Sequence, residues 1–267
     1  MTTLIALGST LPPELPAILA ATVGAVLGAV IGSWLATAAV RWPRQESASG
    51  GRSRCDHCGQ TLALRDLVPL ASWLWLKGRC GVCRQPIHPL HPAMEAASAA
   101  IGAIAFVAHS DRPAVALTGA ALGWALLELA VLDMRHFWLP DRITALLAAA
   151  GLALATGGLG ISLQDSLIGG IAGFGSLSLL AAGYRTLRGH DGLGAGDPKL
   201  LGAIGLWTGW EPLPWVVLGA ALLGISAALV LALARKAPPS EHLRLPLGTL
   251  LAASAWPIWL IGTASGG

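Results

Sequence analysis

Long apolar stretches follow one another along this chain and leave too few charged residues to cover a water-exposed surface. Charged residues make up 12% of the sequence and hydrophobic residues 54%, whereas soluble domains carry roughly 25% charged residues. A membrane helix needs about 20 mostly apolar residues to cross a hydrocarbon core of about 30 Å. The sequence therefore predicts an all-α polytopic membrane protein in a lipid bilayer. It excludes a soluble domain, a disordered chain and a disulfide-stapled secreted domain.

Eight segments are predicted as transmembrane helices, and one of them is too short to cross the bilayer alone. They cover residues 16–40, 92–109, 114–132, 140–157, 166–184, 198–211, 213–234 and 246–264. The short segment, 198–211, is expected to be a half-buried helix or one lengthened by the glycine-rich stretch before it. The one sizeable polar stretch divides the chain into a first transmembrane helix (1–40), a cytoplasmic insert (41–91) and a multi-helix membrane domain (92–267).

The basic residues give the chain a predicted orientation. All of the 17 Lys and Arg residues except Arg112 fall in four alternate loops between the predicted helices. Loops rich in Lys and Arg stay in the cytoplasm, so both termini are expected on the periplasmic side. Arg41 and Arg44 follow the first apolar stretch, which predicts a retained span and not a cleaved signal peptide. A net charge of +3 is too small to indicate a nucleic-acid partner.

The four cysteines all lie in the polar insert, in two C-x-x-C pairs. The pairs are Cys55-Asp56-His57-Cys58 and Cys80-Gly81-Val82-Cys83. Four thiolates at this spacing, with Gly59 and Gly81 beside the turns, are typical of a closed structural zinc site. A reducing cytoplasm disfavours disulfides, whereas iron in a rubredoxin-like site would use the same ligands. His57 is expected to be a turn residue, and competition for the metal is its alternative role.

Two acidic segments lie at predicted cytoplasmic ends of apolar helices. Residues 132–141 contain Asp133 and Asp141, and residues 192–200 contain Asp197. Ionisable residues at the end of a membrane span cost free energy and are candidates for a functional site. Two carboxylates in proximity share one proton, so one can activate water while the other protonates a scissile carbonyl. The sequence therefore permits an aspartic-protease pair, in which Gly194 and Gly196 would leave room for substrate.

Each acid also has a structural alternative. Asp141 and Asp197 could serve as helix caps, and Asp133 could pair with Arg135 or Arg142. Buried polar ties between helices would be the alternative role of Glu95 and Glu128.

The order of these segments resembles the type IV prepilin peptidases, bacterial inner-membrane aspartic proteases with a G-x-G-D motif. The resemblance rests on Gly32-Ser33, Arg41-Trp42-Pro43, the double C-x-x-C insert, His91-Pro92-Ala93-Met94-Glu95, Asp133, Leu139-Pro140-Asp141, Gly194-Ala195-Gly196-Asp197-Pro198-Lys199 and Leu245-Pro246-Leu247-Gly248. It covers nearly the whole chain. The closing segment has Thr249 where the family often has proline.

The resemblance implies the activity and the residues that carry it. Asp133 and Asp197 match the two catalytic aspartates of the family. Five other residues match motif positions whose substrate-binding or supporting roles stay open: Gly194, Gly196, Lys199, Asp141 and Glu95. Family members remove the leader of type IV prepilins or type II secretion pseudopilins after a glycine. Many also methylate the new N-terminus with S-adenosylmethionine. An active site at the cytoplasmic face of the inner membrane is expected here, in a peptidase domain of residues 92–267.

Two other functions are compatible with the same residues. The chain could be a membrane aspartyl protease for another peptide. It could also be a non-catalytic membrane assembly protein in which the acids bind ions and the zinc module docks a partner.

Overall fold

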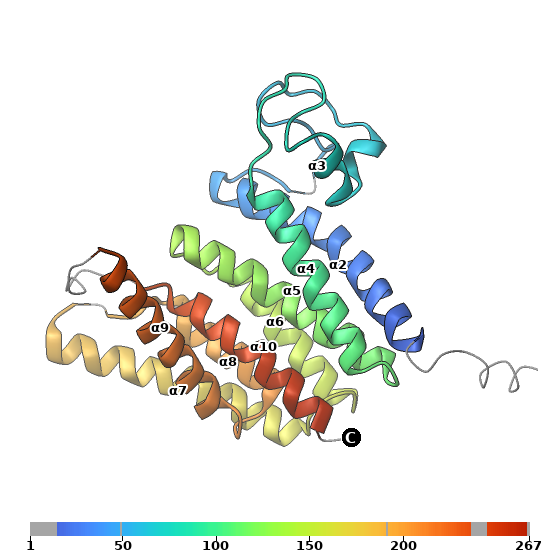
Figure 1. Cartoon of the computed structure of the whole chain (residues 1–267). Helices are drawn as coiled ribbons and strands as arrows, with labels where there is room; N and C mark the ends of the chain where they lie inside the picture. The colour runs from blue at the N-terminus through green and yellow to red at the C-terminus, as the bar shows by residue number, and fades with distance from the viewer. Residues whose placement is uncertain (1–14, 49, 191, 236–244, 266–267) are drawn as a thin grey trace, which may run out of the picture. The chain divides into compact units, whose positions relative to one another are not determined.

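The structure is a computed structural model that describes residues 15–48, 50–190, 192–235 and 245–265, and it is almost entirely helical (Figure 1). A helix lies at each of the eight predicted positions. These helices are α2 (Leu15–Arg41), α4 (Leu90–Ala108), α5 (Pro113–His136), α6 (Asp141–Thr156), α7 (Leu163–Arg188), α8 (Gly196–Thr208), α9 (Leu213–Arg235) and α10 (Leu247–Ser265). The predicted all-α fold is confirmed. Lys236 and Arg244, assigned to a cytoplasmic loop, and both chain ends lie outside the described residues.

Six of these helices are long and apolar enough to cross a membrane, among the residues that the structure describes. They are α2, α4, α5, α7, α9 and α10. The other two, α6 with 16 residues and α8 with 13, extend about 24 Å and 20 Å at 1.5 Å per residue, less than a hydrocarbon core of about 30 Å. One short helix was expected at 198–211, and α6 is a second.

The chain forms two compact units, Met1–Trp124 and Ala125–Gly267, and the boundary falls within α5. The first unit contains the polar insert, with the short helices η1 (Trp42–Arg44), η2 (Leu64–Leu67) and α3 (Ala71–Trp75). The second unit contains Asp133 and Asp197. The domain boundaries at residues 40 and 91 stay a prediction.

In the first unit, α2 packs directly against α4 through glycines (Figure 1). Gly24, Gly28 and Gly32 occur at every fourth position, so they share one face of α2. A Cβ atom at Gly28 would lie 2.0 Å from the carbonyl oxygen of Ser98, and one at Gly24 would lie 2.2 Å from that of Gly102. Small residues at this spacing allow two membrane helices to approach backbone to backbone.

In the second unit, α8 is enclosed by its neighbours. A Cβ at Gly205 would lie 2.2 Å from the carbonyl oxygen of Gly169 on α7. The Trp207 indole N–H donates to the carbonyl of Leu147 on α6 at 2.8 Å, and its ring meets the Trp259 ring of α10 at 6.5 Å. A helix too short to span the bilayer is therefore surrounded by protein. This enclosure buries Asp197, the second residue of α8.

We expect Gly28→Val to push α2 away from α4 and to lower the stability of the folded protein by about 1–3 kcal/mol, as overpacking does. The measurement is thermal unfolding of the purified protein in detergent. Val26→Leu is the matched control, because Val26 lies two residues away with 59% of its surface exposed. Equal unfolding midpoints for the two variants would contradict the close approach of these helices.

Candidate functional site

Asp197 is fixed at the start of α8 by its own loop. Its carboxylate Oδ2 accepts a hydrogen bond from the backbone N–H of Gly194 at 3.0 Å. Only 6% of the residue is exposed. Pro198 follows inside the first turn of α8, where its missing N–H costs no helical bond. The carboxylate therefore belongs to a tight loop-to-helix junction, as the G-x-G-D spacing suggests.

Asp133 lies in the last turns of α5 and is held by the start of α10. Its Oδ2 accepts a hydrogen bond from the backbone N–H of Thr249 at 2.8 Å. The Thr249 hydroxyl lies 3.3 Å from the same oxygen and 2.8 Å from the carbonyl of Ala130. Asp133 is 5% exposed. The sequence also permits Arg135 or Arg142 as its partner, whereas the structure supplies neutral donors from a helix more than 100 residues later in the sequence.

The structure brings Asp133 and Asp197 into one site. Burial, followed by the charge of Asp133, raises the pKa of Asp197 to about 6, and the N–H groups of Gly194 and Gly248 act in the opposite direction. The Gly248 amide is close enough to interact with both carboxylates. Two acids whose charges act on one another in this way do not both ionise as readily as isolated acids.

Leu139 fills the space next to both acids. A Cβ at Gly196 would lie 2.8 Å from the Leu139 Cβ, and one at Gly248 would lie 2.8 Å from the Leu139 Cδ1 and 3.0 Å from Asp133 Oδ2. Glycine at these two positions lets the starts of α8 and α10 approach the segment after α5. A Cβ at Gly194 would lie 3.0 Å from Asp197 Oδ2, so a side chain there would crowd the carboxylate.

Two further predicted residues form an ion pair. Lys199 Nζ lies 2.6 Å from Asp141 Oδ1, and both side chains are partly exposed. Asp141 is the first residue of α6, and Pro140 takes the cap position without a side-chain hydrogen bond. The pair joins the start of α6 to the first turn of α8.

Glu95 and Glu128 have different surroundings. Glu95 lies in the first unit, where its Oε2 accepts the Leu70 N–H at 2.8 Å. Glu128, in α5, is 1% exposed, and neither of its carboxylate oxygens has a hydrogen-bond partner in the described part of the chain. Glu95 thus ties α4 to the residue before α3 in the insert and not to another membrane helix, and no tie is found for Glu128 among the described residues.

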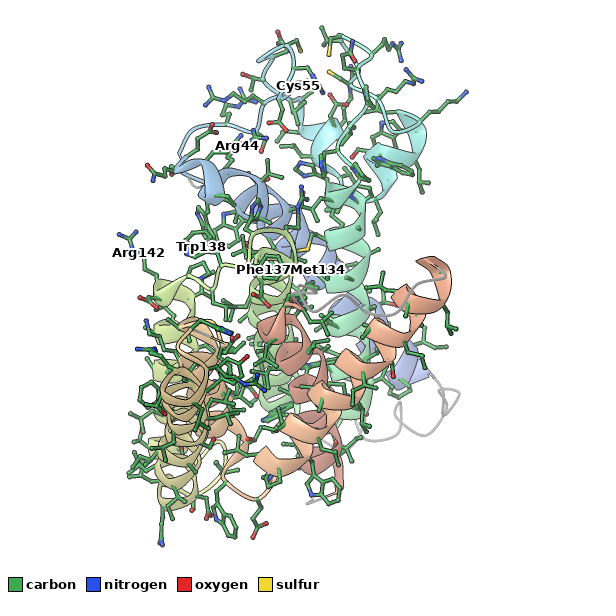
Figure 2. The ribbon with its side chains drawn as sticks, turned by 90° about the vertical axis from the view of Figure 1, so that its left-hand side faces the viewer. Arg44, Cys55, Met134, Phe137, Trp138 and Arg142 are labelled. Atoms are coloured by element: carbon green, nitrogen blue, oxygen red, sulfur yellow. The ribbon has the colours of Figure 1, made fainter. Side chains whose placement is uncertain are left out.

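Exposed apolar side chains surround the end of α5. Figure 2 labels Met134 in the last turn of α5 and Phe137 and Trp138 in the segment that joins α5 to α6, and these residues are 56%, 58% and 41% exposed. Arg142, also labelled there, follows in the first turn of α6. Aromatic residues beside a basic residue at the end of a span are typical of the membrane–water interface. Asp133 therefore lies at the end of its span and not at the bilayer centre.

The four cysteines meet in the first unit. Their sulfur atoms all lie within 4.8 Å of one another, and Cys55 Sγ is 3.8 Å from Cys83 Sγ. Four thiolates around a metal at bonds of about 2.3 Å would stand about 3.8 Å apart, so the cluster fits a tetrahedral metal ion. The N–H groups of Cys83 and Val82 lower the pKa of the Cys80 thiol to about 7, whereas the pKa of the Cys83 thiol is raised to about 11, with the Gln85 N–H lowering it and burial and the neighbouring thiols raising it.

The two cysteine turns are copies of one local structure. Cys55 donates its N–H to the carbonyl of Gln60 at 3.0 Å, and Cys80 donates its N–H to that of Gln85 at 2.8 Å. The left-handed position after each pair is Gly59, with φ 69°, and Arg84, with φ 60°. The turn role expected of Gly81 thus belongs to Arg84. The repeat Arg-Cys-x-x-Cys-x-Gln, at 54–60 and 79–85, was the sequence signal for this equivalence.

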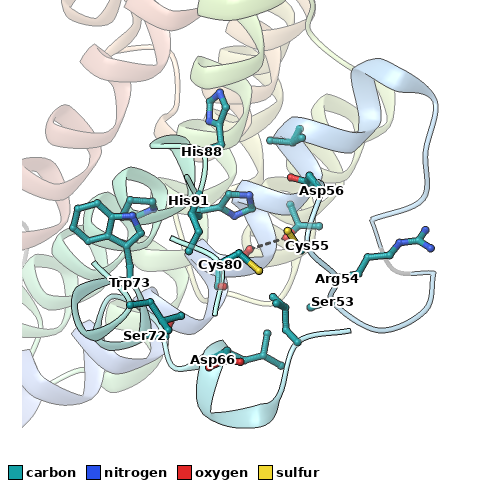
Figure 3. A pocket seen from close by; sticks show the side chains of 18 of the residues that line it. Ser53, Arg54, Cys55, Asp56, Asp66, Ser72, Trp73, Cys80, His88 and His91 are labelled. Atoms are coloured by element: carbon teal, nitrogen blue, oxygen red, sulfur yellow. Dashed lines mark hydrogen bonds between the residues drawn. The ribbon is translucent and has the colours of Figure 1, made fainter. Parts of the chain in front are cut away.

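A cavity of about 530 Å³ lies beside the cysteines in the first unit (Figure 3). Acidic and basic groups both line it, among them Asp56, Asp66, Glu95, Arg41, Arg44 and Arg54. Trp73 also lines it, and its buried indole N–H has no hydrogen-bond acceptor within the described residues. The cavity is large enough for a small molecule.

These features define a class: a multi-pass membrane protein with a buried aspartate pair and a four-cysteine module that could hold a metal ion. Comparison with known proteins gives the family. Residues 26–109 match the Bacterial Peptidase A24 N-terminal domain, and residues 120–229 match the Type IV leader peptidase family. No solved structure gives a significant match.

Three relatives carry the name prepilin leader peptidase/N-methyltransferase. The protein of Burkholderia pseudomallei (strain K96243) is 38% identical over 212 residues, which cover 79% of this chain and 68% of that protein. The protein of Aeromonas hydrophila is 37% identical over 212 residues, 79% of this chain and 72% of the relative. The protein of Pectobacterium carotovorum is 38% identical over 179 residues, 67% of this chain and 63% of the relative. The chain belongs to the type IV leader peptidase family, as the sequence resemblance predicted.

We expect about one bound metal ion per purified chain, and a loss of most of it in Cys80→Ser, because three thiolates hold the ion less tightly than four. Elemental analysis of the protein in detergent measures this. Val82→Ala is the matched control, because Val82 lies between two cysteines with 69% of its surface exposed. Full metal content in Cys80→Ser would contradict a four-thiolate site.

Proposed function

We propose that this protein is an aspartyl endopeptidase of the bacterial inner membrane. It removes the leader from type IV prepilins or type II secretion pseudopilins, after a glycine and at the cytoplasmic face. The observation that carries this proposal is the pair of buried aspartates, Asp133 and Asp197, on separate helices and with the Gly248 amide near both. The names of the relatives supply the substrate class.

Peptide hydrolysis by such a pair follows from its shared proton. The ionised carboxylate takes a proton from a water molecule while the water oxygen forms a bond to the scissile carbonyl carbon. The protonated carboxyl gives its proton to the carbonyl oxygen, which produces a neutral gem-diol. The carbon–nitrogen bond then breaks as the pair gives its proton to the leaving amine, a gem-diol hydroxyl returns its proton to the pair as the carboxylic acid forms, and one proton is again shared between the two acids. The raised pKa of Asp197, about 6, suits the acid role.

The position of the pair suits a substrate that is itself a membrane helix. A prepilin that enters from the bilayer would present its cytoplasmic leader junction at the ends of the spans. Asp133 lies at the end of α5, beside exposed aromatic residues and the basic side chain of Arg142. The positive-inside pattern supports a cytoplasmic location for this end.

The four-cysteine module is proposed to hold zinc and to stabilise the insert. Four protein thiolates leave no coordination position for water, so the ion would not take part in hydrolysis. The insert has no regular strand among its described residues and only short helices, so a metal would supply folding free energy that a hydrophobic core would otherwise provide.

We expect Asp133→Asn and Asp197→Asn each to abolish prepilin cleavage, a loss of at least about 1,000-fold, because an amide cannot replace either member of the pair. Mass spectrometry of a co-purified or added prepilin reads the new N-terminus. Asp165→Asn is the matched control: Asp165 also begins a helix in the second unit, yet it lies next to Gly209, beyond the opposite end of α8.

The outcomes of that experiment separate the candidate functions. Cleavage after glycine by the wild type and by Asp165→Asn, and none by the other two variants, supports the peptidase. Cleavage by either Asp133→Asn or Asp197→Asn would contradict the paired mechanism. A folded wild-type protein that cleaves no prepilin would favour another peptide substrate or the non-catalytic assembly role.

A second activity, N-methylation of the new N-terminus, is favoured by the cavity of the first unit. S-adenosylmethionine supplies a methyl group on a sulfonium, and the molecule carries both cationic and anionic groups. A cavity lined by acids and arginines together suits such a zwitterion better than it suits the uniformly basic leader. Asp66 and Arg44, which line the cavity with opposite charges, would be its polar anchors.

We expect wild-type protein in detergent to bind S-adenosylmethionine, and Asp66→Asn to weaken this binding about tenfold, since the negative charge that faces the cationic groups of the ligand is lost. Equilibrium dialysis with labelled ligand measures the Kd directly, without turnover. Glu46→Gln is the control, because Glu46 is an exposed acid of the same insert that does not line this cavity. Identical Kd values for the two variants would place the methyl donor elsewhere.

A further inference from the structure

The start of α10 offers donors that its own helix does not use. The first amides of a helix have no intrahelical acceptor, and in α10 the N–H of Leu250 is bonded to the Pro246 carbonyl at 3.3 Å. The Thr249 N–H, one residue earlier, points instead at Asp133 Oδ2 at 2.8 Å. Thr249 therefore connects the first turn of α10 to a carboxylate of the proposed catalytic pair.

The Thr249 side chain strengthens this connection. Its hydroxyl has one proton, which is donated to the Ala130 carbonyl at 2.8 Å or to Asp133 Oδ2 at 3.3 Å. Ala130 lies three residues before Asp133, close to one turn along α5, so both acceptors belong to the same helix face. One threonine thus fixes α10 against the last turns of α5 and also orients the carboxylate.

The two aspartates receive unequal support. Asp133 Oδ2 is bonded to the Thr249 N–H and lies within reach of the Thr249 hydroxyl, whereas Asp197 Oδ2 has the Gly194 N–H of its own loop at 3.0 Å. Donors that point at a carboxylate favour its ionised form. Because the Gly248 amide is near both acids, it does not distinguish between them.

We propose that Thr249 is a positioning residue that keeps Asp133 as the ionised member of the pair. This rests on the proposed peptidase function and deepens it by assigning the two roles. Asp133 then accepts the proton of the attacking water, and Asp197 gives its proton to the carbonyl oxygen of the scissile bond. The direction of proton movement is set by a neutral residue on a third helix.

The other titratable groups near Asp133 lie on α5, α6 and α8. Asp197 is the group on α8 whose charge interacts with Asp133, and α10 contains no titratable residue along its length. Asp141, at the start of α6, is paired with Lys199. The remaining titratable groups in this part of α5 and in the first turn of α6 are Glu128, Arg135, His136 and Arg142.

The experiment measures the pH dependence of kcat/KM for prepilin cleavage by full-length protein in detergent. Thr249→Ser keeps both donors, Thr249→Val keeps only the N–H, and Thr249→Pro removes both. Proline is compatible with the first turn of a helix, so the last change removes the donors with little effect on the backbone. Thermal unfolding of each variant in the same detergent reports its stability separately.

We expect the acid limb of the profile to move to higher pH, by about half a pH unit for Thr249→Val and about one unit for Thr249→Pro, while Thr249→Ser matches the wild type. At a pH below the limb, the larger shift corresponds to a roughly tenfold loss of kcat/KM, with KM nearly unchanged. This result supports the assignment of Asp133 as the base.

An acid limb that stays in place in active Thr249→Val overturns the proposal, even if its unfolding midpoint falls, because that outcome leaves Thr249 a purely structural role. Thr249→Val decides the question if Thr249→Pro does not fold. A wild-type protein that cleaves no prepilin would instead contradict the proposed function, which keeps the two failures distinguishable.

Discussion

The mutual repulsion of two buried carboxylates is the constraint on which the second unit depends. Asp133 and Asp197 are both almost fully buried, so each carries a desolvation cost that hydrogen-bond donors must offset. The donors are backbone amides, which come from the loop before α8 and from the first turn of α10. Enclosure of the short helix α8 by protein keeps this arrangement out of the lipid. The packing of α6, α7 and α10 around α8 is therefore part of the site and not only its scaffold.

The first unit uses a different physical solution because its insert has little apolar core. The two cysteine turns repeat one backbone pattern, each with a left-handed residue after the second cysteine. Their four sulfur atoms converge closely enough for one ion. The glycines of α2, by contrast, act within the bilayer, where no hydrophobic effect drives helices together and close backbone contact must do so. Metal binding and helix packing thus stabilise separate parts of the same unit.

The sequence was sufficient for the helices and for the residues with chemical signatures. The lengths of the apolar segments located all eight helices, and the C-x-x-C spacing identified the four cysteines whose sulfur atoms lie close together in the structure. The sequence did not identify residues whose roles depend on which helices pack together. Thr249 has no chemical signature in the sequence and stood out only as a departure from the family pattern, yet its N–H donates a hydrogen bond to Asp133. Arg84 escaped notice because its backbone conformation, not its side chain, is what the second cysteine turn requires.

Gly248 illustrates how these constraints combine at a single position. A side chain there would meet both Leu139 and the Asp133 carboxylate, at 2.8 Å and 3.0 Å from its first carbon, so the start of α10 could not approach α5. Without that approach, neither the Gly248 amide nor the Thr249 N–H would reach the acids. The pair would then hold two poorly solvated carboxylates with fewer donors, and the electrostatic difference between them would diminish. Close packing at Gly248 therefore allows the two aspartates to receive different hydrogen-bond donors. This difference is what allows one aspartate to act as base and the other as acid.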